Sequence, residues 1–323
     1  MNYLEFYRLA REPFSNEPVG SRFYFNSDEH HRAYMRIMHA IENTRGLALL
    51  VGDIGTGKTT IARKVLGSLD DDLYAASLLI VVQTHIDSTS FLKKIAGELG
   101  ANNNHTTKEE CMKAICDKLL ELEASNKKTV LLIDEAQMLK TKEIMEDLRG
   151  LLNIETIDKK LLTIVLFGLP EIETNLKLDP PLSQRVAVKY HLGTLSLHGT
   201  RDYIDFKLHG GEAKDYIFTK ESYYAIHQYT KGIPRLINTL CDNCLLEGFI
   251  MRQDLIDESI VERVAYDIGL GKNYEGYSQL EFTRDRRPSF YDIESSNREE
   301  DSHQRLKEKI KEEIIRELLG DKK

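Results

Sequence analysis

GDIGTGKTT, residues 52–60, follows the apolar run LALLV, residues 47–51, and precedes IARKVLGSL, which has the composition of a helix. The stretch matches the pattern GxxxxGK[ST], in which glycines let backbone N–H groups approach phosphate oxygens closely. A strand before the loop and a helix after it are the setting that the pattern requires, because the helix N-terminus adds positive potential. The sequence therefore predicts a phosphate-binding loop, and we expect its ligand to be ATP.

The residues of this loop are all candidate nucleotide ligands, and two of its side chains have separate roles. Lys58 can place a positive charge at the β- and γ-phosphates. Thr59 can offer its hydroxyl group to a magnesium ion. The predicted set of nucleotide-binding residues is Gly52, Asp53, Ile54, Gly55, Thr56, Gly57, Lys58, Thr59 and Thr60.

Two acids end a second apolar run. TVLLIDE, residues 129–135, places Asp134 and Glu135 at the end of a predicted buried strand. Acids at this position are costly unless a cation or exposed polar groups meet them. We expect Asp134 and Thr59 to hold Mg²⁺, and Glu135 to orient or activate the attacking water. The second acid favours hydrolysis of ATP over binding alone.

Strand and helix patterns alternate along the first two thirds of the chain. Four apolar runs have the length of strands, at residues 47–51, 78–84, 129–135 and 161–168. Continuous apolar strands are expected where both faces of a sheet are covered. Their alternation with helical patterns favours a parallel, doubly wound α/β sheet.

Two local patterns predict where helices begin. Asn26 or Ser27 is expected to cap the helix that follows it, with two acids in its first turn. Further along the chain, Thr106 and Glu109 are expected to form a capping box.

The chain divides into five predicted parts. Strand patterns disappear after about residue 197, and helical patterns follow, which predicts a small all-α lid. From Gly271 the composition is polar and charged, as in a flexible linker. Apolar residues at four-residue steps then indicate a final helix, which is either a solvated terminal helix or a docking and self-association helix. The expected parts are a lead-in at 1–26, the core at 27–197, the lid at 198–270, the linker at 271–300 and an amphipathic helix at 301–320.

Composition narrows the possible classes of function. The formal net charge of −8 argues against a globally basic nucleic-acid binder. Four cysteines suggest no disulfide framework and fit a reducing cytosol. Cys241 and Cys244 form a CxxC, for which we favour two small apolar residues on one side of a lid helix over a metal or redox role. No secretory signal or bilayer span is apparent. We expect a cytoplasmic chain without direct membrane insertion, recruited to the inner membrane or to DNA by a partner.

The order of the motifs resembles that of the AAA+ ATPases, and more narrowly the ExeA/GspA and MshM type of secretion and pilus ATPases. The resemblance covers about residues 1–270 and rests on YLEFYRLAREPFS, RFYFNSDEHHRA, GDIGTGKTT, LLIDEAQML, EDLRGLLNIET, IVLFGLPEI, LSQRVAVKYHLGTL and TKGIPRLIN. EDLRGLLNIET discriminates best among these. The ExeA type commonly has a membrane span and a peptidoglycan-binding region. Neither is apparent in this sequence, so we expect the cytoplasmic MshM-like arrangement here.

The resemblance implies roles for two arginines. Arg185, in LSQRV, falls where such ATPases often present an arginine to the γ-phosphate of a neighbouring subunit, which makes hydrolysis depend on a ring or filament. Arg235, in GIPR, falls at the sensor-2 position of the lid. The alternatives are that Arg185 is an ordinary surface residue and that Arg235 caps a helix or forms a salt bridge.

Two further positions leave questions open. The relatives usually carry a glutamine in VGQPEL at the end of the sensor-1 strand, whereas FGLPE places Leu169 there. Either another residue senses the nucleotide, or hydrolysis is slow. Phe14 and the run from Phe23 to Phe25, in the aromatic lead-in, pack either near the adenine base or in an ordinary core.

Three functions follow from these patterns. The first is an oligomeric ATPase that drives or regulates a secretion or type IV pilus machine, with a protein partner docked on the C-terminal helix. The second is a DNA-dependent regulator of transposition, because TniB, TnsC and MuB share this core and form ATP-bound filaments on duplex DNA. Its channel would be lined by cations such as Lys93, Lys94, Lys159 and Lys160. The third is a nucleotide-switched scaffold with little turnover, which only Leu169 supports.

Overall fold

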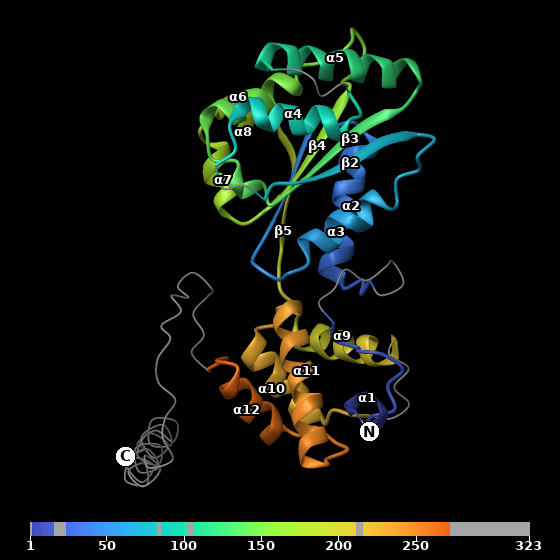
Figure 1. Ribbon diagram of the computed structural model, residues 1–323, viewed down its shortest axis with the longest axis vertical. Helices are drawn as coiled ribbons and strands as arrows, with labels where there is room; N and C mark the ends of the chain where they lie inside the picture. The colour runs from blue at the N-terminus through green and yellow to red at the C-terminus, as the bar shows by residue number, and fades with distance from the viewer. Residues whose placement is uncertain (1, 16–23, 83–84, 102–105, 211–215, 272–323) are drawn as a thin grey trace, which may run out of the picture. The chain divides into compact units, whose positions relative to one another are not determined.

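The computed structural model of the chain describes residues 2–15, 24–82, 85–101, 106–210 and 216–271 (Figure 1). The predicted amphipathic helix at 301–320 and, apart from Gly271, the predicted linker lie outside these residues. Over the described ranges, none of the helices combines the length and the apolar character that a bilayer crossing needs.

Five strands form one sheet in which every neighbouring pair is parallel, in the order β2-β3-β4-β1-β5. The strands are β1 (Leu47–Gly52), β2 (Tyr74–Ile80), β3 (Lys128–Asp134), β4 (Leu162–Gly168) and β5 (Val186–Leu192). This arrangement confirms the predicted parallel α/β fold. Because parallel strands share one direction, the residues that follow β1, β3 and β4 meet at the same edge of the sheet.

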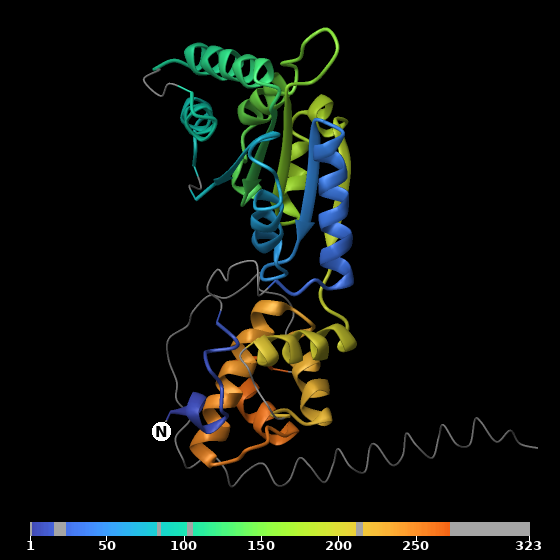
Figure 2. The ribbon, with the colours of Figure 1, turned by 90° about the vertical axis from the view of Figure 1, so that its right-hand side faces the viewer.

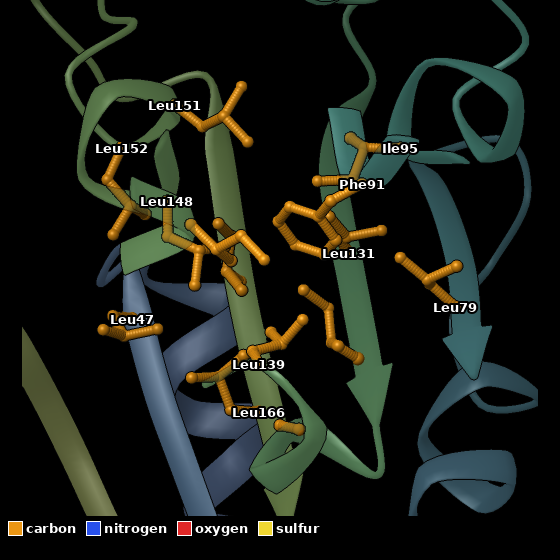
Figure 3. Packing of buried hydrophobic residues seen from close by; sticks show 14 of the residues in the cluster. Leu47, Leu79, Phe91, Ile95, Leu131, Leu139, Leu148, Leu151, Leu152 and Leu166 are labelled. Atoms are coloured by element: carbon orange, nitrogen blue, oxygen red, sulfur yellow. The ribbon is translucent and has the colours of Figure 1, made fainter. Parts of the chain in front are cut away.

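Helices cover both faces of the sheet, as Figures 1 and 2 show. One face carries α4 (Ser88–Glu98), α5 (Lys108–Ala124), α6 (Lys142–Leu151), α7 (Glu171–Leu176) and α8 (Pro180–Ser183); the other carries α2 (Asp28–Glu42) and α3 (Lys58–Leu66). Successive residues of a strand point to opposite faces, so Leu47 packs with the first group and Ala48 with the second. Figure 3 shows the first cluster, in which Phe91 and Ile95 of α4 lie beside Leu131.

Two strands differ from the predictions, and both are edge strands. β2 was expected at 78–84 but runs from Tyr74 to Ile80. Its first five residues are only half-buried. The segment YAAS therefore does not need a run of large apolar residues, and it lacks the pattern by which the other strands were predicted. β5 was not predicted as a strand. Its residues alternate between half-buried and exposed until Leu192, which is the pattern of a strand covered on one face only.

Helix caps agree with the sequence in one case and are shifted in the other. Ser27 caps α2, since its hydroxyl accepts from the N–H of His30. The capping box of α5 joins Thr107 and Glu110, so the predicted pair of Thr106 and Glu109 is wrong by one residue. The carboxylate of Glu110 accepts from the N–H groups of both threonines. The hydroxyl of Thr107 accepts from the N–H of Glu110, which completes the box, whereas the hydroxyl of Thr106 donates to the Glu110 carboxylate.

The helical part has its own hydrophobic cluster. It contains α1 (Tyr3–Phe6), α9 (Leu197–Gly210), α10 (Lys220–Thr230), α11 (Pro234–Met251) and α12 (Glu258–Asp267). Cys241 and Cys244 are fully buried on α11, and burial raises the pKa of both thiols. The described residues contain no group of three metal-ligating side chains. Both cysteines lie in the apolar cluster of this part, where the favoured interpretation of the CxxC places them.

Two of the lead-in aromatics, Phe14 and Phe25, belong to the same cluster. Tyr24 instead packs edge-on against His30, and Phe23 lies outside the described residues. Phe14 packs edge-on against Phe218, and Phe25 lies against Tyr203 and Phe206. For Phe14 and Phe25, packing in a core is therefore the predicted role that the structure supports.

Candidate nucleotide site

The loop between β1 and α3 is held open by two glycines with left-handed backbone. Gly55 has φ of 81° and Gly57 has φ of 101°, a region that residues with a Cβ rarely adopt. Gly57 is the N-cap of α3 and supplies no side-chain cap. The first N–H groups of α3 therefore remain available to an anion, as a phosphate site at a helix N-terminus requires.

Lys58 is buried and folds back on the loop. Its ammonium group donates to the carbonyl oxygens of Gly52 at 2.8 Å and Asp53 at 2.9 Å. Burial lowers the pKa of Lys58, and the nearby carboxylates of Glu135 and Asp134 oppose that shift. The positive charge of Lys58 thus lies at the loop, near two acids.

Thr59 and Asp134 meet across the end of the sheet. The hydroxyl of Thr59 donates to Oδ2 of Asp134 at 2.6 Å, and Asp134 is only 1% exposed. Burial raises the pKa of Asp134, while the hydrogen bonds from Thr59 and from the Glu135 N–H lower it. Two oxygen donors in contact, one of them a buried carboxylate, are the kind of ligands that Mg²⁺ takes. The predicted metal pair therefore fits the ion.

Glu135 has an unusual backbone for its residue type. Its φ of 56° and ψ of 36° lie in the left-handed region, where non-glycine residues are uncommon. Its N–H donates to Oδ1 of Asp134 at 3.0 Å. Its carboxylate accepts from Nε2 of Gln137, in the short helix η2 (Ala136–Met138), at 2.6 Å. The glutamate beside the metal pair is held at both its backbone and its side chain.

His30 contacts the loop from α2, and the sequence analysis gave it no role. Its Nε2 donates to the carbonyl oxygen of Thr56 at 3.0 Å, and its Nδ1 is 2.6 Å from the hydroxyl of Ser27. Burial lowers the pKa of His30, which favours the neutral ring. The only hint in the sequence is the occurrence of DEHHRA among the motifs that carry the resemblance.

The loop before α11 reaches the phosphate loop. The backbone N–H of Arg235 donates to the carbonyl oxygen of Gly55 at 3.3 Å. A Cβ at Gly55 would lie 2.8 Å from Cβ of Arg235, so the two segments touch closely. The Arg235 side chain is exposed and near enough to Lys58 to lower its pKa. Arg235 thus lies beside the site that it was predicted to serve.

Arg185 is not brought to this site. It is exposed and immediately precedes β5. In the parallel register, Val186 pairs with Leu47 and Leu192 pairs with Gly52, so Arg185 lies at the far end of the strand from the loop. Ile54, Asp53 and Thr60 are exposed at the loop.

Leu169 contributes its backbone instead of its side chain. Its N–H donates to Oε1 of Gln137 at 3.1 Å. The polar contact at the end of β4 therefore exists without a polar side chain at this position.

Comparison with known proteins agrees with this geometry. The family described as AAA domain matches residues 41–176. Over 269 residues the chain is 34% identical to General secretion pathway protein A of Aeromonas hydrophila, an alignment that covers 82% of this chain and 48% of that protein. The chain belongs to the AAA+ P-loop proteins. It spans about half the length of this AAA+ relative.

Solved AAA+ structures share the fold at low sequence identity. The ADP form of the ORC2 protein of Aeropyrum pernix matches with a TM-score of 0.61 and 15% identity, covering 80% of this chain and 72% of that chain. The ORC1 protein of the same organism in complex with DNA matches with a TM-score of 0.56 and 18% identity, covering 79% and 68%. At these identities the likeness is one of fold.

Proposed function

We propose that this chain is a Mg²⁺-dependent ATPase that works as an oligomer in a secretion or type IV pilus machine. The observation that carries the hydrolytic part is the contact between Thr59 and Asp134 with Glu135 beside it. The similarity to General secretion pathway protein A supports the secretion part.

The residues of the site divide the work of hydrolysis. Bound Mg²⁺, held by Thr59 and Asp134, would neutralise charge on the phosphates. Lys58 would exchange its bonds to Gly52 and Asp53 for bonds to phosphate oxygens. Glu135 would accept a hydrogen bond from the attacking water and orient it.

Assembly would complete the site. Arg185 is exposed and lies roughly 20 Å along β5 from the chain's own phosphate loop, at about 3.3 Å per residue. It can therefore act only on the nucleotide of another copy, where an arginine stabilises charge in the transition state. Arg235, by contrast, would report the nucleotide bound by its own chain.

Phosphate release at rising protein concentration tests this proposal. Wild-type protein should show Mg²⁺-dependent release whose specific rate rises with concentration. Glu135→Gln should bind ATP and stop turnover, and Arg185→Ala should bind ATP normally and lose the concentration dependence. Arg201→Ala changes an exposed arginine on α9, in the helical part, and should behave as wild type. Absence of release from wild type would refute hydrolysis, and normal turnover by Arg185→Ala would refute the trans arginine.

The proposed machine is tested in a strain that encodes the chain. Deletion of its gene should block assembly of a secretion or pilus complex, and Glu135→Gln should fail to restore it. We place the partner contact on residues 301–320. Truncation at residue 271 that left both the assembly and partner binding intact would refute that placement.

A second candidate is hydrolysis stimulated by duplex DNA. Lys93 and Lys94 of α4 line an open hollow beside the edge strand β2, and paired cations of this kind suit a phosphate backbone. Lys159 supports the idea less, because it pairs with Glu123. The ATPase rate and the sedimentation should be compared with and without DNA at two salt concentrations. No response at low salt would remove this candidate.

A further inference from the structure

Gln137 lies between the metal-side acids and the end of β4. It is 5% exposed, and both ends of its side-chain amide are bonded. Nε2 donates to Oε2 of Glu135 at 2.6 Å, and Oε1 accepts from the N–H of Leu169 at 3.1 Å. A backbone N–H can only donate, so the amide oxygen must face Leu169 and the NH₂ group must face Glu135. The orientation of the amide is therefore fixed by its neighbours.

The main chain around Gln137 is anchored as well. Its carbonyl oxygen accepts from Nδ2 of Asn175 in α7 at 3.0 Å. A Cβ at Gly168 would lie 3.1 Å from Oε1 and 3.3 Å from the backbone nitrogen of Gln137. That position therefore has to be small for the amide to reach the end of β4. These contacts hold Gln137 in one position, from which its side chain can fix the position of a neighbouring side chain.

The side chain held in this way is that of Glu135. Its left-handed backbone is uncommon for a glutamate and persists only where the surroundings impose it. The hydrogen bond from the Gln137 side chain occupies one carboxylate oxygen of Glu135 and leaves the other free to accept a hydrogen bond from water.

We propose that Gln137 is a positioning residue that fixes the carboxylate of Glu135 for hydrolysis and ties it to the end of β4 through Leu169. This role rests on the proposed ATPase function. It also answers the question raised by Leu169, because the contact at the end of β4 is made by its backbone N–H and by Gln137. A leucine at 169 is then no obstacle to turnover.

Two substitutions distinguish the hydrogen bond to Glu135 from the hydrogen bond to Leu169. Gln137→Glu keeps an acceptor for the Leu169 N–H but turns an oxygen toward the Glu135 carboxylate in place of the donor. Gln137→Met preserves the volume and removes both bonds. Gln228→Glu on α10 adds the same charge at an exposed position and serves as the control.

The experiment measures kcat and KM for ATP together with binding of a fluorescent ATP analogue and thermal unfolding. Both variants of Gln137 should lose roughly 10- to 100-fold in kcat, as expected when a reacting group is misplaced. KM and analogue affinity should stay within about twofold of wild type, because neither variant touches the phosphate loop. The control should match wild type throughout.

The outcomes distinguish this role from the function on which it rests. Wild-type turnover with unchanged kcat in both Gln137 variants would overturn the positioning role alone. A rise in kcat would mean that the amide restrains Glu135, and would overturn it too. A fall in kcat matched by lost analogue binding would assign Gln137 to folding of the site. Absence of turnover in wild type would refute hydrolysis and, with it, this role.

Discussion

Replacement of Gly57 by alanine places a methyl group where the structure has no room for one. A Cβ at this position would lie 2.6 Å from Nε2 of His30, well inside a normal contact distance. The backbone of Gly57 is also left-handed, with φ of 101°. The substitution thus combines a conformational cost with a steric one, and both act on the phosphate loop.

The two costs can be estimated separately. The left-handed conformation costs an alanine roughly 1–2 kcal/mol relative to glycine. His30 must move to admit the methyl group, which breaks its bond to the Thr56 carbonyl oxygen, at a net loss of about 0.5–1.5 kcal/mol. Together they destabilise the folded chain by roughly 1.5–3.5 kcal/mol. For a domain of this size that lowers Tm by about 3–14 °C.

Thermal unfolding followed by circular dichroism measures the effect against a matched control. Gly269 has a similar φ of 77° and nothing within 4 Å of its Cβ position. Gly269→Ala therefore carries the conformational cost without the clash and should lower Tm by about half to two thirds as much as Gly57→Ala. In a His30→Ala background, Gly57→Ala should cost no more than the control.

Equal Tm values for Gly57→Ala and Gly269→Ala would refute the steric part of the reasoning. A full loss that persists in the His30→Ala background would show that His30 is not the side chain that resists the methyl group.

Three more predictions follow from the site. Lys58→Met removes a charged donor to phosphate, worth about 1.5–3 kcal/mol, so the Kd for a fluorescent ATP analogue should rise at least tenfold; an unchanged Kd would contradict the assignment. Arg149→Met breaks the ion pair between Nε of Arg149 and Asp179 at 2.8 Å. Asp179 caps α8, which ends just before the predicted trans arginine. Concentration-dependent turnover should therefore fall, while the affinity for the ATP analogue stays constant. The pKa of His30 is depressed by burial, with Lys64 lowering it and Glu29 raising it. Its stabilising contribution is complete above about pH 6.5 and is lost as pH falls through its folded pKa, so Tm should drop between pH 7.5 and 5.5 more steeply in wild type than in His30→Asn.

The phosphate loop and the acidic pair were predictable because their signals are local. Residues 52–60 carry the motif, its glycines and the start of the helix in one stretch. Asp134 and Glu135 stand at the end of a continuous apolar run, and parallel strands bring such ends together. Central strands are buried on both faces, so their sequences are apolar throughout. The edge strands β2 and β5 lack that signal, so the bounds of β2 were misplaced and β5 was not predicted.

The remaining contacts depend on where distant segments fold. His30 and Thr56 are 26 positions apart, and neither carries a pattern that joins them. Leu169 was judged by its side chain, whereas its backbone N–H makes the contact, and a backbone group is the same in every residue except proline. Gln137 was within a recognised motif, but only the fold places its amide between two partners.

Strand β5 runs from the predicted trans arginine to the phosphate loop. It begins directly after Arg185, and it ends at Leu192, beside Gly52. Three residues later the N–H of Leu195 donates at 2.8 Å to the carbonyl oxygen of Gly232, in the loop that leads to Arg235. In an assembly in which Arg185 serves a neighbour, one extended strand would separate the neighbour's γ-phosphate from the chain's own loop and lid. The spacing between successive ATP molecules would then be set by the length of a single strand. An extended strand of seven residues changes little in length, so a shift at one end would move the other end. Release of the nucleotide from one site would then displace the lid of the neighbouring chain.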